Sequence, residues 1–218
     1  MKKTNLNLKK HLYIVITGLD GAGKTTLIDD LEKFFSSKGL KVKTAHSPYD
    51  EHLRYEVLPA LGNDSHGDRL LFALDNHILG AKIREWLVDY DIVITQRGPF
   101  DSFVHGQVQG FTYEEVERLN CTKSLPAADI MVHLCASAEI AFERIKNDPD
   151  ADKFEYLSYI VEQEKMTRKG YSDLVLKKEP ALSSFFGTRN LFVDTTDFTT
   201  KDTFEYVIHR LLKIIREK

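Results

Sequence analysis

Cysteines and long apolar runs are both scarce in this chain, and each shortage excludes a class of protein. Only two cysteines, Cys121 and Cys135, occur among 218 residues. They are too far apart for a CxxC pair and have no cluster of metal-ligating residues around them, so we expect neither a disulfide framework nor a cysteine metal centre. No apolar segment is long enough to follow the basic start of the chain as a signal or an anchor. We therefore expect a cytoplasmic protein whose residues 1–10 form a flexible basic tail.

The chain also lacks a strong excess of charge of either sign. Lysine and arginine number 30, and aspartate and glutamate 33, for a net charge of −3. This balance gives no electrostatic reason to expect a nucleic acid or a membrane surface as partner. No repeat, low-complexity tract or linker rich in proline and glycine divides the chain. With 42% hydrophobic residues it can bury a substantial core, and we predict a single domain over residues 1–218.

What the chain does contain is a regular alternation of apolar runs and helical patterns. The apolar runs predict five buried strands, at residues 12–17, 41–46, 91–95, 129–134 and 190–194. Amphipathic spacing and capping residues predict helices at residues 25–39, 68–87, 112–119, 138–147 and 202–215, and one more that ends near Gly170. This order predicts an α/β fold in three layers, a five-stranded parallel sheet with helices on both faces. Ligands bind such sheets at the carboxyl ends of the strands.

A glycine-rich segment joins the first predicted strand to the first helix. Its residues 18–25, GLDGAGKT, match the pattern G-x-x-x-x-G-K-[ST] in full. The glycines let backbone N–H groups turn toward phosphate oxygens, and the start of the helix adds partial positive charge. Lys24 would reach the β- and γ-phosphates, and the Thr25 hydroxyl would bind Mg²⁺. The segment predicts a site for ATP and Mg²⁺, formed by Gly18, Gly21, Ala22, Gly23, Lys24, Thr25 and Thr26.

This segment also resembles the phosphate loop of the thymidylate kinase family, and the resemblance continues along most of the chain. It is carried by DRLLFALDNH, DIVITQR, DSFVHGQ, ADIMVHL, AFERI with DKFE, and KGY, in that order. The resemblance implies a P-loop kinase fold with a short lid near residues 145–156, and a homodimer. It also implies an enzyme that transfers the γ-phosphate of ATP to a pyrimidine monophosphate, either dTMP or a related or modified nucleotide.

The resemblance assigns several residues to the acceptor. Asp20 would accept a hydrogen bond from the sugar 3′-hydroxyl, and Phe72 would stack on the base. Arg54 would hold the acceptor phosphate, and Gln107 is retained from the family's acceptor segment. The residues themselves leave other readings open, since Phe72 lies on a leucine-rich helix and Arg54 follows a segment that departs from the family's pattern. Phe72 could therefore be a core residue, and Arg54 a surface one.

Two arginines are implied in catalysis beside Lys24. Arg97 follows the third predicted strand, where it could hold an acceptor phosphate or the transferred phosphoryl group. Arg144 leads into the predicted lid. Phosphoryl transfer asks a protein mainly for positioning and positive charge, which is why these residue types fit the reaction. A structural ion pair for Arg97 and a solvated helix face for Arg144 remain the alternatives.

Three departures from the family fall inside the predicted site. Gln96 replaces an aspartate that helps to position Mg²⁺, and Asp101 could compensate for the lost charge by acting through water. Asn76 replaces an arginine that reads the base, and an amide offers both a donor and an acceptor. His105 and Gly106 replace a small residue and a tyrosine. These changes leave the phosphate-binding residues intact, but they leave the identity of the acceptor base open.

Two other functions stay open at this point. A deoxynucleoside kinase would act on an unphosphorylated 5′-hydroxyl and needs a general base at the end of the third strand. Gln96 stands there and cannot accept a proton, unless Asp101 serves instead. A nucleotide-binding protein with little turnover would also fit the loss of the acid at position 96.

Overall fold

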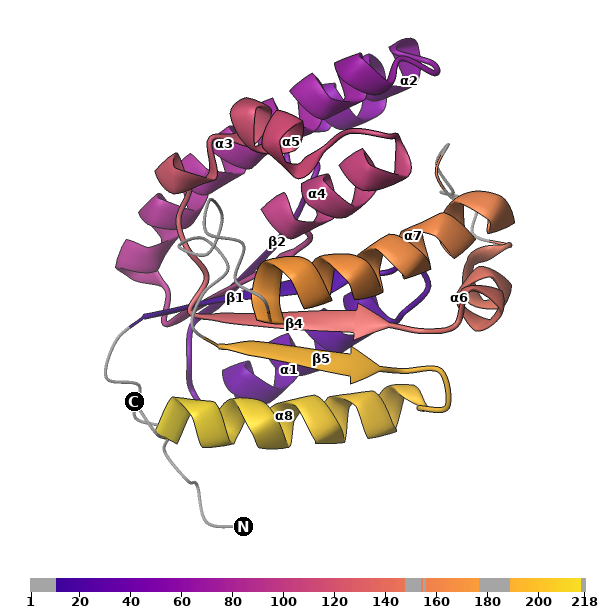
Figure 1. The fold of residues 1–218 in the computed structure, drawn as a ribbon. Coiled ribbons are helices and arrows are strands. Elements are labelled where there is room, and N and C mark those ends of the chain that lie inside the picture. Colours follow the sequence, from indigo (N-terminus) through magenta and orange to yellow (C-terminus); the bar gives the residue numbers. More distant parts are fainter. Residues whose placement is uncertain (1–10, 148–153, 155, 177–188, 217–218) are drawn as a thin grey trace.

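Five parallel strands form the centre of the molecule (Figure 1). The structure, a computed structural model, describes residues 11–147, 154, 156–176 and 189–216. The strands are β1 (Leu12–Gly18), β2 (Val42–His46), β3 (Ile92–Gln96), β4 (Ile130–Cys135) and β5 (Asn190–Asp194). They lie in the order β2-β3-β1-β4-β5, and each neighbouring pair is parallel. The predicted five-stranded parallel sheet is confirmed.

Helices cover both faces of the sheet, because its central strand is apolar on both sides. In β1, Ile14 and Ile16 belong to one buried cluster, and Tyr13 and Val15 belong to another. Residues of α1 (Lys24–Ser37) and α8 (Thr200–Arg216) complete the first cluster. Residues of α3 (Ser65–Asp89), α4 (Pro99–Val108) and α5 (Tyr113–Asn120) complete the second. In Figure 1, α1 and α8 lie below the sheet and α3, α4 and α5 above it, which confirms the three layers.

The remaining elements connect these layers. They are η1 (Leu53–Val57), α2 (Leu58–Ala60), η2 (Thr122–Ser124), α6 (Ala138–Ile145), α7 (Leu157–Gly170) and η3 (Tyr171–Leu176). The six predicted helices are present as α1, α3, α5, α6, α7 and α8. The tail predicted over 1–10 and most of the lid predicted near 145–156 lie outside the described residues. Within those residues, no helix combines the length and apolar character needed to cross a membrane.

One major helix, α4, was not predicted from the sequence. Its residues from Pro99 to Gly106 are all buried, because α3, α5 and α7 pack against it. A helix that is buried on every side has no apolar stripe opposite a polar one, so hydrophobic periodicity gives no signal for it. The short η1 and α2 were not predicted either.

The predicted helix starts were more successful. Thr112 N donates to Glu115 Oε2 at 2.8 Å, and Glu115 N donates to Thr112 Oγ1 at 3.2 Å, which is the reciprocal pattern of a capping box. The Ser137 hydroxyl accepts from Ile140 N at 3.4 Å at the start of α6. These local signals were readable because both partners lie within three residues of each other.

Candidate active site

The glycine-rich loop lies at the carboxyl end of the central strand, between β1 and α1. Gly18, Gly21 and Gly23 have φ angles of 120°, 79° and 93°, a region that side chains rarely adopt. At two of them a side chain would also collide with backbone. A Cβ on Gly18 would lie 1.9 Å from Leu134 O, and one on Gly21 would lie 2.2 Å from Ala141 O. The loop therefore needs glycine both for its turn and for its close approach to β4 and α6.

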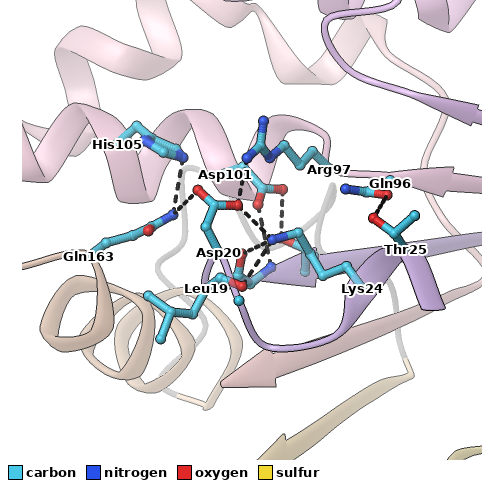
Figure 2. A network of polar contacts seen from close by, with 12 residues as sticks. Leu19, Asp20, Lys24, Thr25, Gln96, Arg97, Asp101, His105 and Gln163 are labelled. Atoms are coloured by element: carbon cyan, nitrogen blue, oxygen red, sulfur yellow. Dashed lines mark hydrogen bonds and ion pairs between the residues drawn. The ribbon is translucent and has the colours of Figure 1, made fainter. Parts of the chain in front are cut away.

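Lys24, the lysine of this loop, is buried and pairs with the loop itself (Figure 2). Its Nζ donates to Gly18 O and to Leu19 O, each at 2.9 Å, and to Asp20 Oδ1 at 2.8 Å. Arg97 Nη2, from the end of β3, reaches the same Asp20 oxygen at 2.5 Å. Two cations from different elements thus share one carboxylate at the edge of the sheet where ligands bind.

The charges in this cluster determine the ionisation of Asp20. Burial by itself would raise the pKa of Asp20, but the charges of Arg97 and Lys24 outweigh it and hold the pKa well below its ordinary value. The backbone of Arg97 has a φ of 65°, which is uncommon for a residue with a side chain. Its N–H donates to Ile16 O at 2.9 Å, and this bond ties the strained residue to β1. Strain of this kind gathers at functional sites.

A cavity of about 1390 Å³ opens over this cluster. Its floor is the phosphate loop from Asp20 to Thr26, with Gln96 and Arg97 beside it. One wing extends along the segment after β2, where it is lined by His46, Arg54 and Tyr55 among others. The other wing extends past Arg144 to the loop after β5, which contributes Thr195, Phe198 and Thr199. A cavity that runs to both sides of a phosphate loop has room for two ligands that meet over it.

Two neutral oxygens at this cavity could help to hold a metal ion. Thr25 Oγ1 donates to Gln96 Oε1 at 3.1 Å, and both residues line the cavity. Oxygen donors suit Mg²⁺, which is usually held by one or two protein ligands together with water and phosphate. The described residues contain no group of three or more His, Cys, Asp or Glu side chains that could hold a metal by themselves. The residues present fit an ion that is bound mostly by the nucleotide.

Asp101 does not lie where it could replace the aspartate that is missing at position 96. Its carboxylate is buried beneath the loop, where it accepts from Thr17 Oγ1 at 2.6 Å, Gly98 N at 3.0 Å and Gly18 N at 3.3 Å. It is not among the residues that line the cavity. Burial raises the pKa of Asp101, although Lys24 and the hydrogen bonds oppose this. Asp101 therefore joins α4 to the start of the phosphate loop, and its position gives no support to a role at the metal.

The two arginines predicted at the edges of the site both line the cavity. Arg144, on α6, donates from Nη2 to Thr195 O at 3.0 Å and from Nη1 to Gly21 O at 3.2 Å. Its guanidinium therefore contacts the phosphate loop, although the residue is exposed on α6. Arg54, on η1, lies 2.8 Å from His46 Nε2 through Nη1, and its guanidinium stacks over the Tyr55 ring.

Three residues predicted to contact the acceptor are not brought to this cavity. Asn76 is buried, and its Nδ2 donates to Asn120 Oδ1 at 2.8 Å and to Ser102 Oγ at 3.1 Å. Gln107 Nε2 donates to Phe111 O at 2.5 Å, near the end of α4. Phe72 packs against a small apolar cluster that includes Leu58 and Tyr159. The contacts of Asn76 and Gln107 are internal to the protein, and the roles assigned to these three residues stay predictions.

Sequence reasoning missed a polar chain behind Asp20 (Figure 2). Gln163 Nε2, from α7, lies 3.2 Å from Asp20 Oδ2 and 3.3 Å from His105 Nε2. A carboxylate can only accept, so the amide nitrogen faces Asp20 and also donates to His105 Nε2. His105 Nδ1–H then donates to Tyr159 OH at 2.7 Å. Burial lowers the pKa of His105 to about 3, so the ring is neutral, as this pattern requires.

The sequence indicated some members of this hydrogen-bonded group and not others. His105 was visible in the sequence as a departure from the family, but nothing indicated its partners. Gln163 lies in the middle of an ordinary helical pattern, and it is 143 positions from Asp20. Only the tertiary packing of α7, which contacts α4, α6 and β4, brings the two together.

The fold and the site together define a P-loop kinase: a parallel α/β sheet with a G-x-x-x-x-G-K-T loop after its central strand and arginines gathered around that loop. The chain belongs to the thymidylate kinase family, whose model, described as Thymidylate kinase, matches residues 16–183. It is accordingly an ATP-dependent nucleotide kinase. Membership does not favour a nucleoside kinase or a binding protein without turnover.

Named members of the family are similar to this chain over most of their length. A thymidylate kinase of Caldicellulosiruptor saccharolyticus is 32% identical over 155 residues, which cover 67% of this chain and 75% of that protein. A probable thymidylate kinase of Pyrobaculum aerophilum is 29% identical over 153 residues, or 68% and 77% of the two chains. A thymidylate kinase of Mycobacterium tuberculosis is 30% identical over 157 residues, or 65% and 73%.

Proposed function

We propose that this chain transfers the γ-phosphate of ATP to a pyrimidine deoxynucleoside monophosphate of the dTMP type, with Mg²⁺ as cofactor, in the cytoplasm. The observation that carries the proposal is the sharing of the Asp20 carboxylate by Lys24 and Arg97 on the floor of the two-winged cavity. Cations placed in this way can exchange a carboxylate for phosphate oxygens, which are also anionic acceptors. The proposal also includes a single domain over residues 1–218, with its lid near 145–156.

In the proposed reaction an oxygen of the acceptor phosphate attacks the γ-phosphorus. The bond from that phosphorus to the β–γ bridging oxygen breaks, and ADP leaves with this oxygen and its electron pair. Lys24, Arg97 and Arg144 would neutralise the charge that spreads over the transferred group, and the enzyme forms no covalent intermediate. When bound, Mg²⁺ supplies further positive charge to the phosphate oxygens, with Thr25 and Gln96 as its protein contacts.

The acceptor would occupy the wing of the cavity that follows β2. Arg54 lines this wing, where its guanidinium can bind the acceptor phosphate. Asp20 lies between the two wings and can accept from the sugar 3′-hydroxyl once Lys24 turns to the ATP phosphates. We place the base beyond Asp20, on the side of Phe72, Asn76 and Gln107. ATP would fill the opposite wing, where Arg144 holds the phosphate loop against the loop after β5.

A coupled assay of ADP release tests the proposed function. With ATP and Mg²⁺, we expect turnover of dTMP and none of thymidine, because Arg54 and Arg97 are placed for a phosphate. A Lys24→Met variant should lose turnover by several orders of magnitude, whereas Lys33→Met should keep it, because that lysine on α1 is 77% exposed and pairs with Asp30 at the surface. Turnover of thymidine in preference to dTMP would replace the proposal with a nucleoside kinase.

We further propose that the chain forms a homodimer through α3. Leu70 and Leu74, one turn apart, are 58% and 52% exposed, and Val88 continues the same face at 73%. Large apolar side chains in one stripe on a surface helix are typical of a protein interface. Sedimentation should give a dimer for the wild type and a monomer for Leu74→Glu. A matched control is Val161→Glu on α7, at a position 43% exposed, which should remain dimeric. A monomeric wild type would refute the dimer.

A further inference from the structure

Asp75, in the third turn of α3, carries a carboxylate into the interior of the protein, where it is 0% exposed. Its Oδ2 accepts from Ser47 Oγ at 2.7 Å, and its Oδ1 accepts from Tyr49 N at 2.6 Å and from Asp50 N at 2.9 Å. Burial raises the pKa of Asp75, and these hydrogen bonds oppose the effect. All three donors belong to the segment that follows β2. The buried carboxylate therefore holds this segment against α3.

The hold on this segment extends to the short helix η1. Asp50, whose N–H donates to Asp75, caps the start of η1, because its Oδ1 accepts from Leu53 N at 3.0 Å. The backbone oxygen of Asp50 accepts from Arg54 N at 3.0 Å. η1 is a π-helical turn, a geometry that is rare and often occurs at functional sites. Two successive hydrogen bonds thus connect the Asp75 carboxylate to the backbone of Arg54.

The same segment forms a wall of the acceptor wing. Its residues that line the cavity are Ser47, Pro48, Arg54 and Tyr55. Asp75 is not among the lining residues, so it lies behind this wall. A shift of η1 would move the Arg54 guanidinium, and a misplacement of about 1 Å in a binding group can cost on the order of a hundredfold in rate.

We propose that Asp75 is a positioning residue for the acceptor: it fixes residues 47–54 so that Arg54 can bind the acceptor phosphate, and it does not touch the ligand itself. This inference rests on the proposed function, which places the acceptor phosphate at Arg54. The role requires hydrogen bonds and no charge. An asparagine at this position can make the same contacts, because its Oδ1 can accept from the two backbone N–H groups and its Nδ2 can donate to the Ser47 hydroxyl.

Steady-state kinetics with dTMP test the proposal. We measure kcat, KM for dTMP and KM for ATP in the wild type, in Asp75→Leu, which removes the carboxylate oxygens, and in Asp75→Asn, which keeps the pattern of contacts. We expect Asp75→Leu to raise KM for dTMP roughly ten- to a hundredfold, the effect of weakening hydrogen bonds to a charged group. KM for ATP should not change, because ATP occupies the opposite wing. Asp75→Asn should restore most of the affinity for dTMP.

The matched control is Asp129→Leu. Asp129 precedes β4, at the end of the sheet opposite the cavity, and its Oδ2 accepts from Tyr13 N at 3.0 Å. This variant makes the same substitution and loses a hydrogen bond to a backbone N–H, as Asp75→Leu does. It should keep the wild-type KM for dTMP. An equal rise of KM for dTMP in both variants would show that any loss of this kind has the same effect, which overturns the proposal.

A double-mutant cycle asks whether Asp75 acts through Arg54. In the Arg54→Met background, Asp75→Leu should raise KM for dTMP little further, because the guanidinium that Asp75 positions is absent. Additive effects of the two substitutions overturn the proposal, and so does an equal loss of dTMP affinity in Asp75→Leu and Asp75→Asn. If Asp75→Leu fails to fold, Asp50→Ala removes only the cap on η1. That variant should raise KM for dTMP severalfold, and an unchanged KM overturns the proposal.

The proposed function and this inference can fail separately. Amides of residues 49–54 should exchange hydrogen faster in Asp75→Leu than in the wild type, while those of the phosphate loop should not change. If the wild type turns over none of the monophosphates, the proposed kinase activity fails, and calorimetric binding of dTMP then decides the role of Asp75. Binding that is weakened in Asp75→Leu and retained in Asp75→Asn sustains the inference. Equal binding by all three proteins, binding by none, or unchanged exchange at residues 49–54 overturns it.

Discussion

Replacing Asp20 by asparagine tests how the central charge cluster is held. The Asp20 carboxylate is buried and accepts from Lys24 at 2.8 Å and from Arg97 at 2.5 Å. Asparagine keeps the shape and one acceptor oxygen but removes the charge, which leaves the buried Lys24 without the carboxylate that it contacts. Breaking a buried ion pair by removing one partner costs about 3–5 kcal/mol. The Arg97 side chain is 20% exposed, so water can replace part of its contact.

We therefore expect a loss of about 2–4 kcal/mol in the free energy of unfolding, which is below the full range for a buried pair. For a chain of this size, that loss lowers the melting temperature by roughly 5–15 °C. A non-hydrolysable ATP analogue with Mg²⁺ should raise the melting temperature of the variant more than that of the wild type. The reason is that its phosphate oxygens supply the anion that Lys24 has lost, whereas in the wild type they must first compete with Asp20.

Differential scanning fluorimetry, with and without the analogue, measures both effects. Asp30→Asn is the matched control, because that aspartate on α1 pairs with Lys33 at the surface and should leave the melting temperature nearly unchanged. Equal melting of Asp20→Asn and wild type without ligand would show that the carboxylate does not hold the two cations. If the analogue raises the melting temperature of both proteins equally, phosphate and the Asp20 carboxylate do not compete for Lys24 and Arg97.

Three further predictions concern the metal, the loop and pH. Gln96→Asp places a charge beside Thr25 and should lower the Mg²⁺ concentration for half-maximal activity about tenfold; an unchanged requirement would exclude residue 96 from the metal site. Gly21→Ala should abolish ATP binding in a calorimeter, because a Cβ would lie 2.2 Å from Ala141 O, and normal binding would contradict the loop geometry. His105 has its pKa lowered to about 3, so the unfolded state binds the extra proton between pH 3 and 6.5 and stability falls as pH drops through that range. Urea unfolding should show a loss of about 1.2 kcal/mol between pH 6 and 5 from this ring, and His105→Gln should remove that share of the slope.

The phosphate loop is the part of the site that sequence reasoning described best. Its glycines, Lys24 and Thr25 follow one another along the chain, and their spacing alone predicts a turn of the backbone that binds phosphate. Arg97 was found for a related reason, since the end of a buried strand marks the edge of the sheet where ligands bind. The partners of these residues were not found. Nothing local indicates that Lys24 pairs with Asp20, or that Arg97 shares the same oxygen.

The acceptor side shows where motif reasoning stops. Asn76 was predicted to face a base, and this role stays a prediction; its Nδ2 donates to Ser102 Oγ and Asn120 Oδ1, on two other elements. Asp101 was considered as a replacement for the acid missing at position 96, but it caps the turn into α4 and holds Thr17. Both side chains have the right chemistry for the predicted role. The contacts of Asn76 and Asp101 depend on how α4 packs. The sequence of α4 has no hydrophobic periodicity, so the helix was not predicted.

The sequence by itself determined the five strands, six of the helices, the phosphate loop and the caps at Thr112 and Ser137. These are set by patterns within a few residues, and local backbone chemistry does not depend on distant partners. Only the tertiary structure decided which polar groups share a partner and which are left unpaired. Asp20 meets Gln163 across 143 positions, and two donors of the buried Arg69 have no hydrogen-bond partner in the part of the chain that the structure describes, because helices from separate parts of the chain pack over one edge of the sheet. Packing of that kind has no signature in residue spacing.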